Sequence, residues 1–439
     1  MACAVVLTPA ADGPVRGGRR SARLGPALSW ASIALCSSLA SVALAQPAAL
    51  PTATTADAAE EAELQRALAR DAGTAGPATT AAAVPVAAAY SSPAAAGWQT
   101  ILPDISLILD TALAAFVGAP RQTGAHDPAQ RGFNLQQLEM HLESSVDPYL
   151  ELQANLVFSQ FGVEVEEAYG RTLAAPLGLQ LRMGQFLARA GRSNPTHPHA
   201  WHFADQALVN GKFFGSEGQR GLGAEVSWLA PLPWVVELIA AAAMPNGACC
   251  ARSFGGGQAI SVGGARDLAL NLRLEQFFDL SPRASLLVGV GGLAGPNSTG
   301  FWNRTEIAIA DVMFRWRDQG DAQRRAFTLQ IEMMGRRRQV PDRLLQDAGV
   351  TASAVARLAL RWEAGLRFEH VLGVADDPLD PSWTADRTRS TAQVTFYPSH
   401  FSRLRAQASW DRRPAEARDG FAAFLAFEAL IGAHGAHSY

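Results

Sequence analysis

The sequence predicts an all-β protein: a transmembrane antiparallel β-barrel of about 14 to 16 strands, preceded by a signal peptide and a low-complexity leader. Segments such as 327–333 (FTLQIEM) and 268–274 (LALNLRL) alternate apolar and polar residues, which is the period of a strand with two different faces. The polar face carries charge, as at Glu332 and Arg273, so it suits a wet lumen while the apolar face meets lipid. Beyond residue 45, no run of about 20 apolar residues predicts a membrane-spanning helix.

Residues 1–45 have the composition of a secretory signal peptide. Four arginines between Arg16 and Arg23 form a basic region, a mostly apolar run follows over 28–44, and Ala43-Leu44-Ala45 supplies a cleavage site between small residues. We therefore expect an exported protein. Together with a barrel, this export signal predicts the outer membrane of a Gram-negative cell envelope.

Residues 46–97 are rich in Ala, Thr and Pro, and we expect them to form a periplasmic leader. Within it, 57–70 favours a short helix, since Leu64 and Leu68 lie one turn apart among charged residues. Such a helix is too short to be stable alone. Its alternative role is to help subunits associate through a short coiled coil.

The barrel itself is expected over residues 98–439, with the first strand near Ile105. Short turns are predicted at 147–148, 231–233, 281–283 and 398–400, and longer loops at 118–132, 247–264, 291–303, 337–352 and 373–387. Short turns belong to the periplasmic side and long loops to the outside. Tryptophans near the expected strand ends suit the lipid headgroups: Trp228, Trp234, Trp316, Trp362 and Trp410. The terminal Tyr439 looks like an outer-membrane insertion signal.

Cysteine and charge content exclude several classes of protein. After the signal peptide only Cys249 and Cys250 remain; they favour a loop disulfide, with two thiols for a soft metal as the alternative. The net charge is −3 and Lys212 is the single lysine. No basic block with interleaved aromatic residues predicts nucleic-acid binding. Gly-x-Ser-x-Gly and His-Glu-x-x-His are absent, and we expect no enzyme activity.

A histidine-rich passage is the first candidate site. His197, His199 and His202 lie close in sequence to Asp205. Imidazole and carboxylate groups bind zinc, copper or nickel, so these four residues form a candidate metal site, with zinc as the cofactor considered. The alternative is a folded loop whose histidines bond to the backbone or contact lipopolysaccharide.

Successive side chains of a strand point to opposite faces, and this alternation assigns charged side chains of both signs to the inward face. The expected pore-lining residues are Glu139, Glu143, Glu151, Arg182, Arg273, Glu275, Glu332, Arg336, Glu363, Arg367, Arg403 and Arg405. Acidic and basic walls would create a transverse field that sorts solutes by charge. The alternative is mutual pairing that stabilises a filled lumen.

Three segments carry a resemblance to a known family: 163–169 (VEVEEAY), then 183–186 (MGQF), then 191–195 (GRSNP). With them, the portion 133–439 resembles the porin-like Gram-negative outer-membrane proteins grouped around the phosphate-selective porins. The His-rich loop and the ending 432–437 (GAHGAH) resemble the subset described as zinc-regulated or TonB-dependent receptors.

Residues and resemblance together predict an outer-membrane porin-like channel for the passive diffusion of small solutes. An outer-membrane protein that takes up or binds a transition metal such as zinc is one alternative, and a closed structural or adhesion barrel is the other. The expected partners are outer-membrane lipid and lipopolysaccharide, the barrel assembly machinery and small solutes, with a homotrimer as the candidate assembly.

Overall fold

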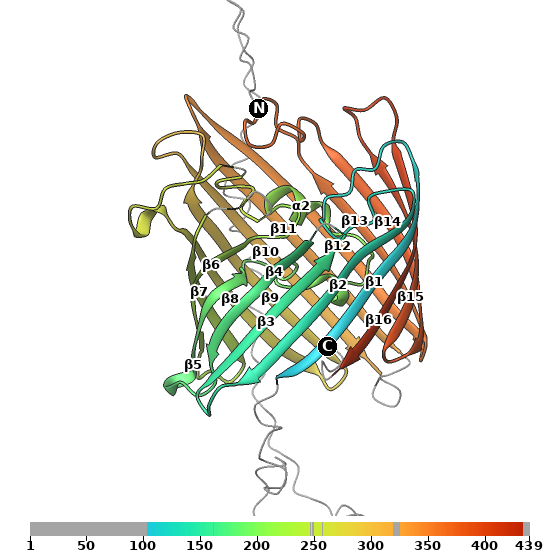
Figure 1. Cartoon of the computed structure of the whole chain (residues 1–439), viewed down its shortest axis with the longest axis horizontal. Coiled ribbons are helices and arrows are strands. Elements are labelled where there is room, and N and C mark those ends of the chain that lie inside the picture. The colour runs from blue at the N-terminus through green and yellow to red at the C-terminus, as the bar shows by residue number, and fades with distance from the viewer. Residues whose placement is uncertain are drawn as a thin grey trace, which may run out of the picture. The chain divides into compact units, whose positions relative to one another are not determined.

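The computed structural model describes residues 103–160, 162–245, 247, 250–256, 258–318 and 325–432. They form sixteen strands in one closed barrel, in which each strand pairs antiparallel with its sequence neighbours and β16 pairs with β1 (Figure 1). The signal peptide, the leader with its helix, Cys249 and Tyr439 lie outside the described residues. The strand count lies at the upper end of the predicted range.

The strands are long enough to cross a bilayer at a tilt. Their bounds are β1 Asp104–Val117, β2 Gly132–Ser145, β3 Leu150–Ser159, β4 Gly162–Thr172, β5 Leu179–Leu187, β6 Arg220–Leu229, β7 Val235–Ala243, β8 Ala269–Ser281, β9 Ala284–Pro296, β10 Arg304–Arg317, β11 Ala326–Val340, β12 Arg343–Ala359, β13 Trp362–Val371, β14 Arg387–Ser399, β15 Ser402–Arg412 and β16 Gly420–Gly432. Among the described residues, no helix is long and apolar enough to cross a membrane.

Burial is inverted relative to a water-soluble protein. Leu272 and Leu366 expose 58% and 65% of their surface, whereas Arg273 and Arg389 expose 1% each. Exposure of so much leucine surface to water would be unfavourable. Contact of this surface with lipid removes that cost. The alternation read from the sequence is therefore the alternation of lipid-facing and inward side chains.

Two predicted loops are wrong. The range 337–352 was expected outside, but β11 continues to Val340 and β12 begins at Arg343, with Asp342 in a left-handed conformation at the turn (φ 65°). Likewise β9 continues to Pro296, so it occupies the first six residues of the predicted loop 291–303. The strand can carry these charges because Arg336 and Arg338 face inward and pair with carboxylates that are distant in the sequence, such as Asp380.

The 188–219 connection between β5 and β6 lies inside the barrel rather than outside it (Figure 1). It contains two short elements, η5 (Pro198–Ala200) and α2 (Leu208–Phe213), and every residue of α2 is buried. A sixteen-stranded barrel is too wide to be filled by its own inward side chains. The connection occupies part of that width.

An apolar core fixes the C-terminal half of this connection to the wall. Inward positions of β8 to β13, where alternation had predicted polar groups, are apolar at several points and form one cluster with α2 and with the β7–β8 connection. The cluster consists of Ala190, Leu208, Val209, Phe213, Phe214, Ala251, Phe254, Ala269, Leu293, Ile307, Ile309, Met334, Val371 and Trp383. This part of the lumen is filled by hydrophobic contacts.

Candidate functional site

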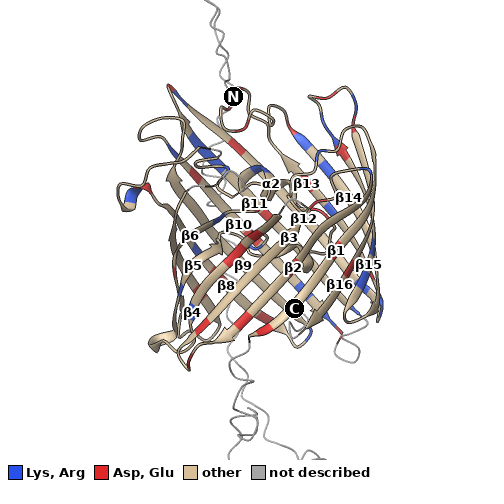
Figure 2. Ribbon diagram, in the orientation of Figure 1, with Lys and Arg blue, Asp and Glu red and all other residues tan. Residues whose placement is uncertain are grey.

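Inward charges are segregated around the wall. Figure 2 marks the acidic and basic residues along the strands. Strands β2 to β4 form an acidic arc: Glu139, Glu143, Glu151, Glu164, Glu166 and Glu167, with Arg171 as the arginine among them. Strands β13 to β15 and the residue after β15 form a basic arc: Arg367, Arg387, Arg389, Arg403, Arg405 and Arg413, interspersed with Glu363, Glu369 and Asp411. The 188–219 connection contacts both arcs, so it lies in the field between them.

A β-bulge concentrates negative charge in the acidic arc. Asn155 of β3 pairs with Glu167, while the next residue, Leu156, pairs with Val165, so Glu166 is an extra residue in the ladder. A bulge of this kind re-aims side chains. As a result the consecutive Glu166 and Glu167 are both buried inside the barrel, at 4% and 5% exposure.

His197 is held among three of these carboxylates. Its Nδ1 lies 3.0 Å from Oε2 of Glu166 and 3.6 Å from Oε1 of Glu139. Its Nε2 lies 2.9 Å from both Oε2 of Glu167 and Nδ2 of Asn155. Burial lowers the pKa of His197, but the Glu166 and Glu139 carboxylates outweigh it and raise that pKa well above 6.5. The acidic arc thus attracts a cation to this point.

His199 orients one of the same carboxylates. Its ring stacks on that of His197, with centroids 5.7 Å apart and planes at 19°. Its Nδ1 lies 2.7 Å from Oε2 of Glu139. The other oxygen of Glu139, Oε1, accepts no hydrogen bond from the described residues although Glu139 is fully buried.

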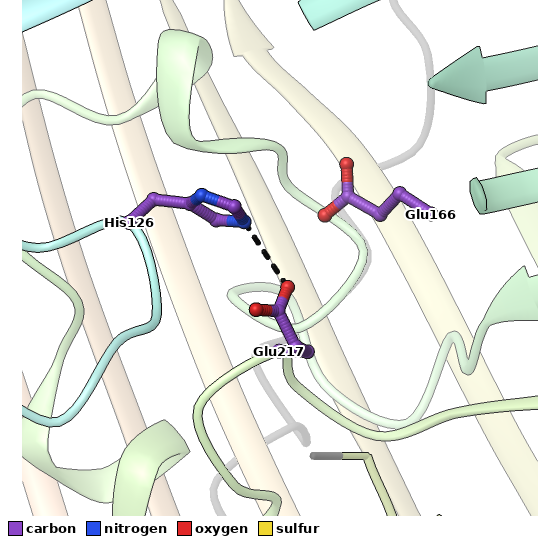
Figure 3. A group of neighbouring side chains, drawn as sticks. All are labelled: His126, Glu166 and Glu217. Atoms are coloured by element: carbon purple, nitrogen blue, oxygen red, sulfur yellow. Dashed lines mark hydrogen bonds and ion pairs between the residues drawn. The ribbon is translucent and has the colours of Figure 1, made fainter. Parts of the chain in front are cut away.

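Another histidine, His126 of the β1–β2 connection, faces Glu217 and Glu166 (Figure 3). Its Nε2 lies 3.1 Å from Oε2 of Glu217. Burial lowers the pKa of His126, yet the hydrogen bond and charge of Glu217 raise it to about 9. The ring is therefore cationic at neutral pH.

This raised pKa predicts a pH-dependent stability. Because the folded pKa of His126 exceeds the unfolded value of about 6.5, its stabilisation is fully present below pH 6.5 and is lost as pH rises through about 9. Unfolding of His126→Gln in lipid vesicles should therefore show a large loss of stability near pH 6 that shrinks at higher pH. The control is His400→Gln, at an exposed turn position; a loss at His126 that is constant with pH would contradict the prediction.

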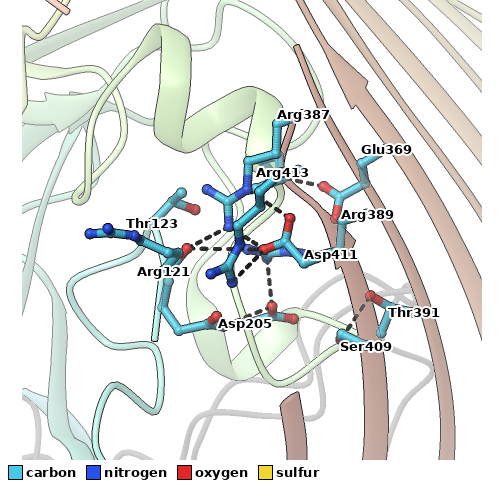
Figure 4. Close-up of polar contacts among 12 residues, drawn as sticks. Arg121, Thr123, Asp205, Glu369, Arg387, Arg389, Thr391, Ser409, Asp411 and Arg413 are labelled. Carbon is cyan, nitrogen blue, oxygen red and sulfur yellow. Dashed lines mark hydrogen bonds and ion pairs between the residues drawn. The ribbon is translucent and has the colours of Figure 1, made fainter. Parts of the chain in front are cut away.

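The basic arc holds Asp205 from several sides. Its carboxylate accepts hydrogen bonds from Arg367 (2.7 Å), Arg389 (2.8 Å) and Gln407 (2.7 Å). Nearby, Asp411 is bound by Arg387 and Arg413 (Figure 4). Burial raises the pKa of Asp205, but the two arginines more than offset this and lower it below its ordinary value.

The four predicted metal ligands are not brought together. His197 and His199 lie at the acidic arc, whereas Nδ1 of His202 lies 3.1 Å from Glu363 and Asp205 is neutralised by two arginines. The set of His197, His199, His202 and Asp205 is therefore corrected, because His202 and Asp205 lie against the basic arc and have other partners. Zinc binding stays a prediction.

All twelve predicted pore-lining residues occupy inward positions. Several are deeply buried in ion pairs, among them Arg273, which binds Asp311 with both side chains 1% exposed. Others retain solvent exposure, such as the side chains of Glu143 at 38% and Glu275 at 27%. Their part in solute passage stays a prediction.

Sequence reasoning missed Glu167, His126 and Glu217. Glu167 had a signal, since two consecutive glutamates break the alternation in 163–169, and such a break marks a bulge. His126 and Glu217 had none, because they lie in connections where no period relates side chains to a face.

The sequence of the chain is similar to that of one protein described below. No family model matches it. An uncharacterized protein of Aquifex aeolicus (strain VF5) is 30% identical over 397 residues, which cover 78% of this chain and 81% of that protein.

Three solved structures share the fold. The outer-membrane channel DcaP of Acinetobacter baumannii aligns with a TM-score of 0.51 at 11% identity, over 75% of this chain and 97% of that one. OprB of Pseudomonas putida, in its high-pH structure, gives 0.50 at 10%, over 75% and 94%. The anion-selective porin of Comamonas acidovorans gives 0.50 at 10%, over 75% and 99%. The predicted outer-membrane β-barrel fold is confirmed; the phosphate-selective and zinc-regulated resemblances stay predictions.

Proposed function

The chain belongs to the family of the Aquifex aeolicus protein and is an outer-membrane barrel of the porin type, and on this premise we propose that it is a channel for the passive diffusion of small polar solutes. The proposal involves no catalytic step. Solutes would pass through the lumen beside the 188–219 connection, which narrows it.

The charge distribution of the inward face is the observation that carries this proposal. A barrel with only a structural role needs no segregation of its lumenal charges, whereas an acidic arc and a basic arc at different parts of the wall orient dipolar solutes and discriminate between ions. Partly exposed charges, such as Glu143 and Arg189, would be the first to meet a solute.

A closed barrel is the second candidate, and one observation favours it. The apolar core around α2 fills the lumen beside β8 to β13 with hydrophobic contacts. Single-channel recording of the refolded protein in planar bilayers separates the two functions. Discrete conductance steps are expected for the channel, and their absence from verified, folded insertions would support the closed barrel.

We also predict which charges set ion selectivity. Glu143 and Glu164 are the partly exposed carboxylates of the acidic arc, at 38% and 44% of their side chains. The variant Glu143→Gln/Glu164→Gln should shift the reversal potential in a salt gradient towards anions, because it removes negative charge beside the path.

The matched control is Glu306→Gln. Glu306 is half exposed on the outer face of β10, so this change removes a carboxylate from the outside of the barrel. The reversal potential of the control should stay as in the parent. An equal shift in both variants would show that surface charge, and not the lumen, sets the selectivity.

A further inference from the structure

We propose that Glu139, Glu166 and His197 bind one divalent first-row transition-metal ion, such as Zn²⁺, inside the barrel. One carboxylate oxygen from each glutamate and one imidazole nitrogen lie within 4.8 Å of one another. Two of the three donors come from the wall, on β2 and β4, and the third from the 188–219 connection. The site goes beyond the diffusion channel and does not depend on it.

The spacing of the donor atoms fits a tetrahedral ion. Ligands bonded at about 2.0 to 2.1 Å in tetrahedral geometry lie about 3.3 Å apart. Nδ1 of His197 lies 3.0 Å from Glu166 and 3.6 Å from Glu139, so both separations lie within 0.3 Å of that value. An ion could enter between these atoms with side-chain adjustments of a few tenths of an ångström.

Neighbouring groups already hold two of the three donors, His197 and Glu139, in a ligating orientation. Glu167 lies 2.9 Å from Nε2 of His197; a carboxylate on the second ring nitrogen is the usual partner of a metal-bound histidine, because it directs the first nitrogen to the metal. His199 holds Oε2 of Glu139. The remaining oxygen of Glu139, Oε1, is buried and faces the site, and within the described part of the chain it accepts no hydrogen bond.

The surroundings distinguish this cluster from the buried aspartates of the lumen. Asp205, Asp311, Asp347 and Asp411 are each bound by arginine. Within the part of the chain that the structure describes, the ion pairs of Glu139, Glu166 and Glu167 are with histidine. No fixed guanidinium therefore competes with a metal ion for these carboxylates.

The donor set also selects the kind of ion. Two carboxylate oxygens and one imidazole nitrogen suit borderline divalent ions such as Zn²⁺, whereas Ca²⁺ prefers six to eight oxygen donors and Cu(I) prefers sulfur. The side chain of His197 is 14% exposed, so an ion in the lumen can reach the site.

Calorimetric titration of the full chain, refolded in detergent, with Zn²⁺ tests the proposal. The parent should bind Zn²⁺, and Glu139→Gln and His197→Gln should each weaken binding by at least about tenfold, since even loss of a supporting residue typically costs 10- to 100-fold. His197 lies in a connection, so this variant keeps the test valid if Glu139→Gln does not fold. Retained migration as a folded barrel in unheated gels is the criterion for folding.

His202→Gln is the matched control, because it removes an imidazole of the same connection that faces Glu363 of β13 and not the proposed site. It should bind Zn²⁺ as the parent does. No binding by the parent would overturn the proposal, and so would binding that survives in both Glu139→Gln and His197→Gln, since the ion would then be held elsewhere, for example by the C-terminal histidines. Conductance measurements are independent of all these results.

Discussion

Replacing Asp205 with alanine is expected to lower the free energy of unfolding by about 3 to 5 kcal/mol. The carboxylate is 1% exposed and binds Arg367 and Arg389. Its removal would leave two buried guanidinium groups without their shared counter-charge. The free-energy cost of such uncompensated buried charges exceeds the net stabilisation that the ion pairs provide. Equilibrium unfolding in lipid vesicles, with urea as denaturant, measures the change.

Glu416→Ala is the control for this prediction. Glu416 also pairs with two arginines, Arg121 and Arg413, but its side chain and that of Arg121 are exposed to 31% and 57%. Water screens such pairs, so the loss should be about 0 to 1 kcal/mol. If the two variants lost equal stability, the buried ion pairs of Asp205 would contribute no more to stability than the exposed ion pairs of Glu416.

Arginine on the lipid face is expected to be the second most damaging substitution. Leu272 lies within β8, is 58% exposed and points away from the neighbouring inward Arg273. Leu272→Arg should cost about 2 to 4 kcal/mol, because the guanidinium would enter the hydrocarbon of the bilayer. The same unfolding assay in vesicles measures it.

Leu229→Arg tests whether the depth of the side chain decides the cost. Leu229 is similarly exposed, at 52%, but is the last residue of β6 and lies next to a short turn. An arginine there can reach the headgroups, so a cost of about 0 to 1 kcal/mol is expected. A cost at Leu272 as small as that at Leu229 would contradict the assignment of the outer face.

The site could be predicted only in part. Parity placed Glu139, Arg273 and Glu332 inside correctly, because each lies in a strand whose neighbours alternate. The grouping of His197 with Asp205 was wrong, since they lie eight positions apart in an irregular connection and their partners come from strands at different parts of the wall.

The sequence by itself determined the outer-membrane barrel, the inward or outward direction of most strand residues, and the large number of charged side chains on the inward face. These properties are local, because each strand must present apolar side chains to lipid and polar ones to the lumen, and alternation records that demand residue by residue.

Only the tertiary structure decided what lies in the lumen. Three features depend on contacts between segments far apart in the chain. They are the position of residues 188–219 inside the barrel, the apolar core around α2, and the proximity of Glu139 to His197. The bulge at Glu166 depends on the register with β3. No period in a single segment encodes these contacts, because their energy arises when side chains of different strands are buried together.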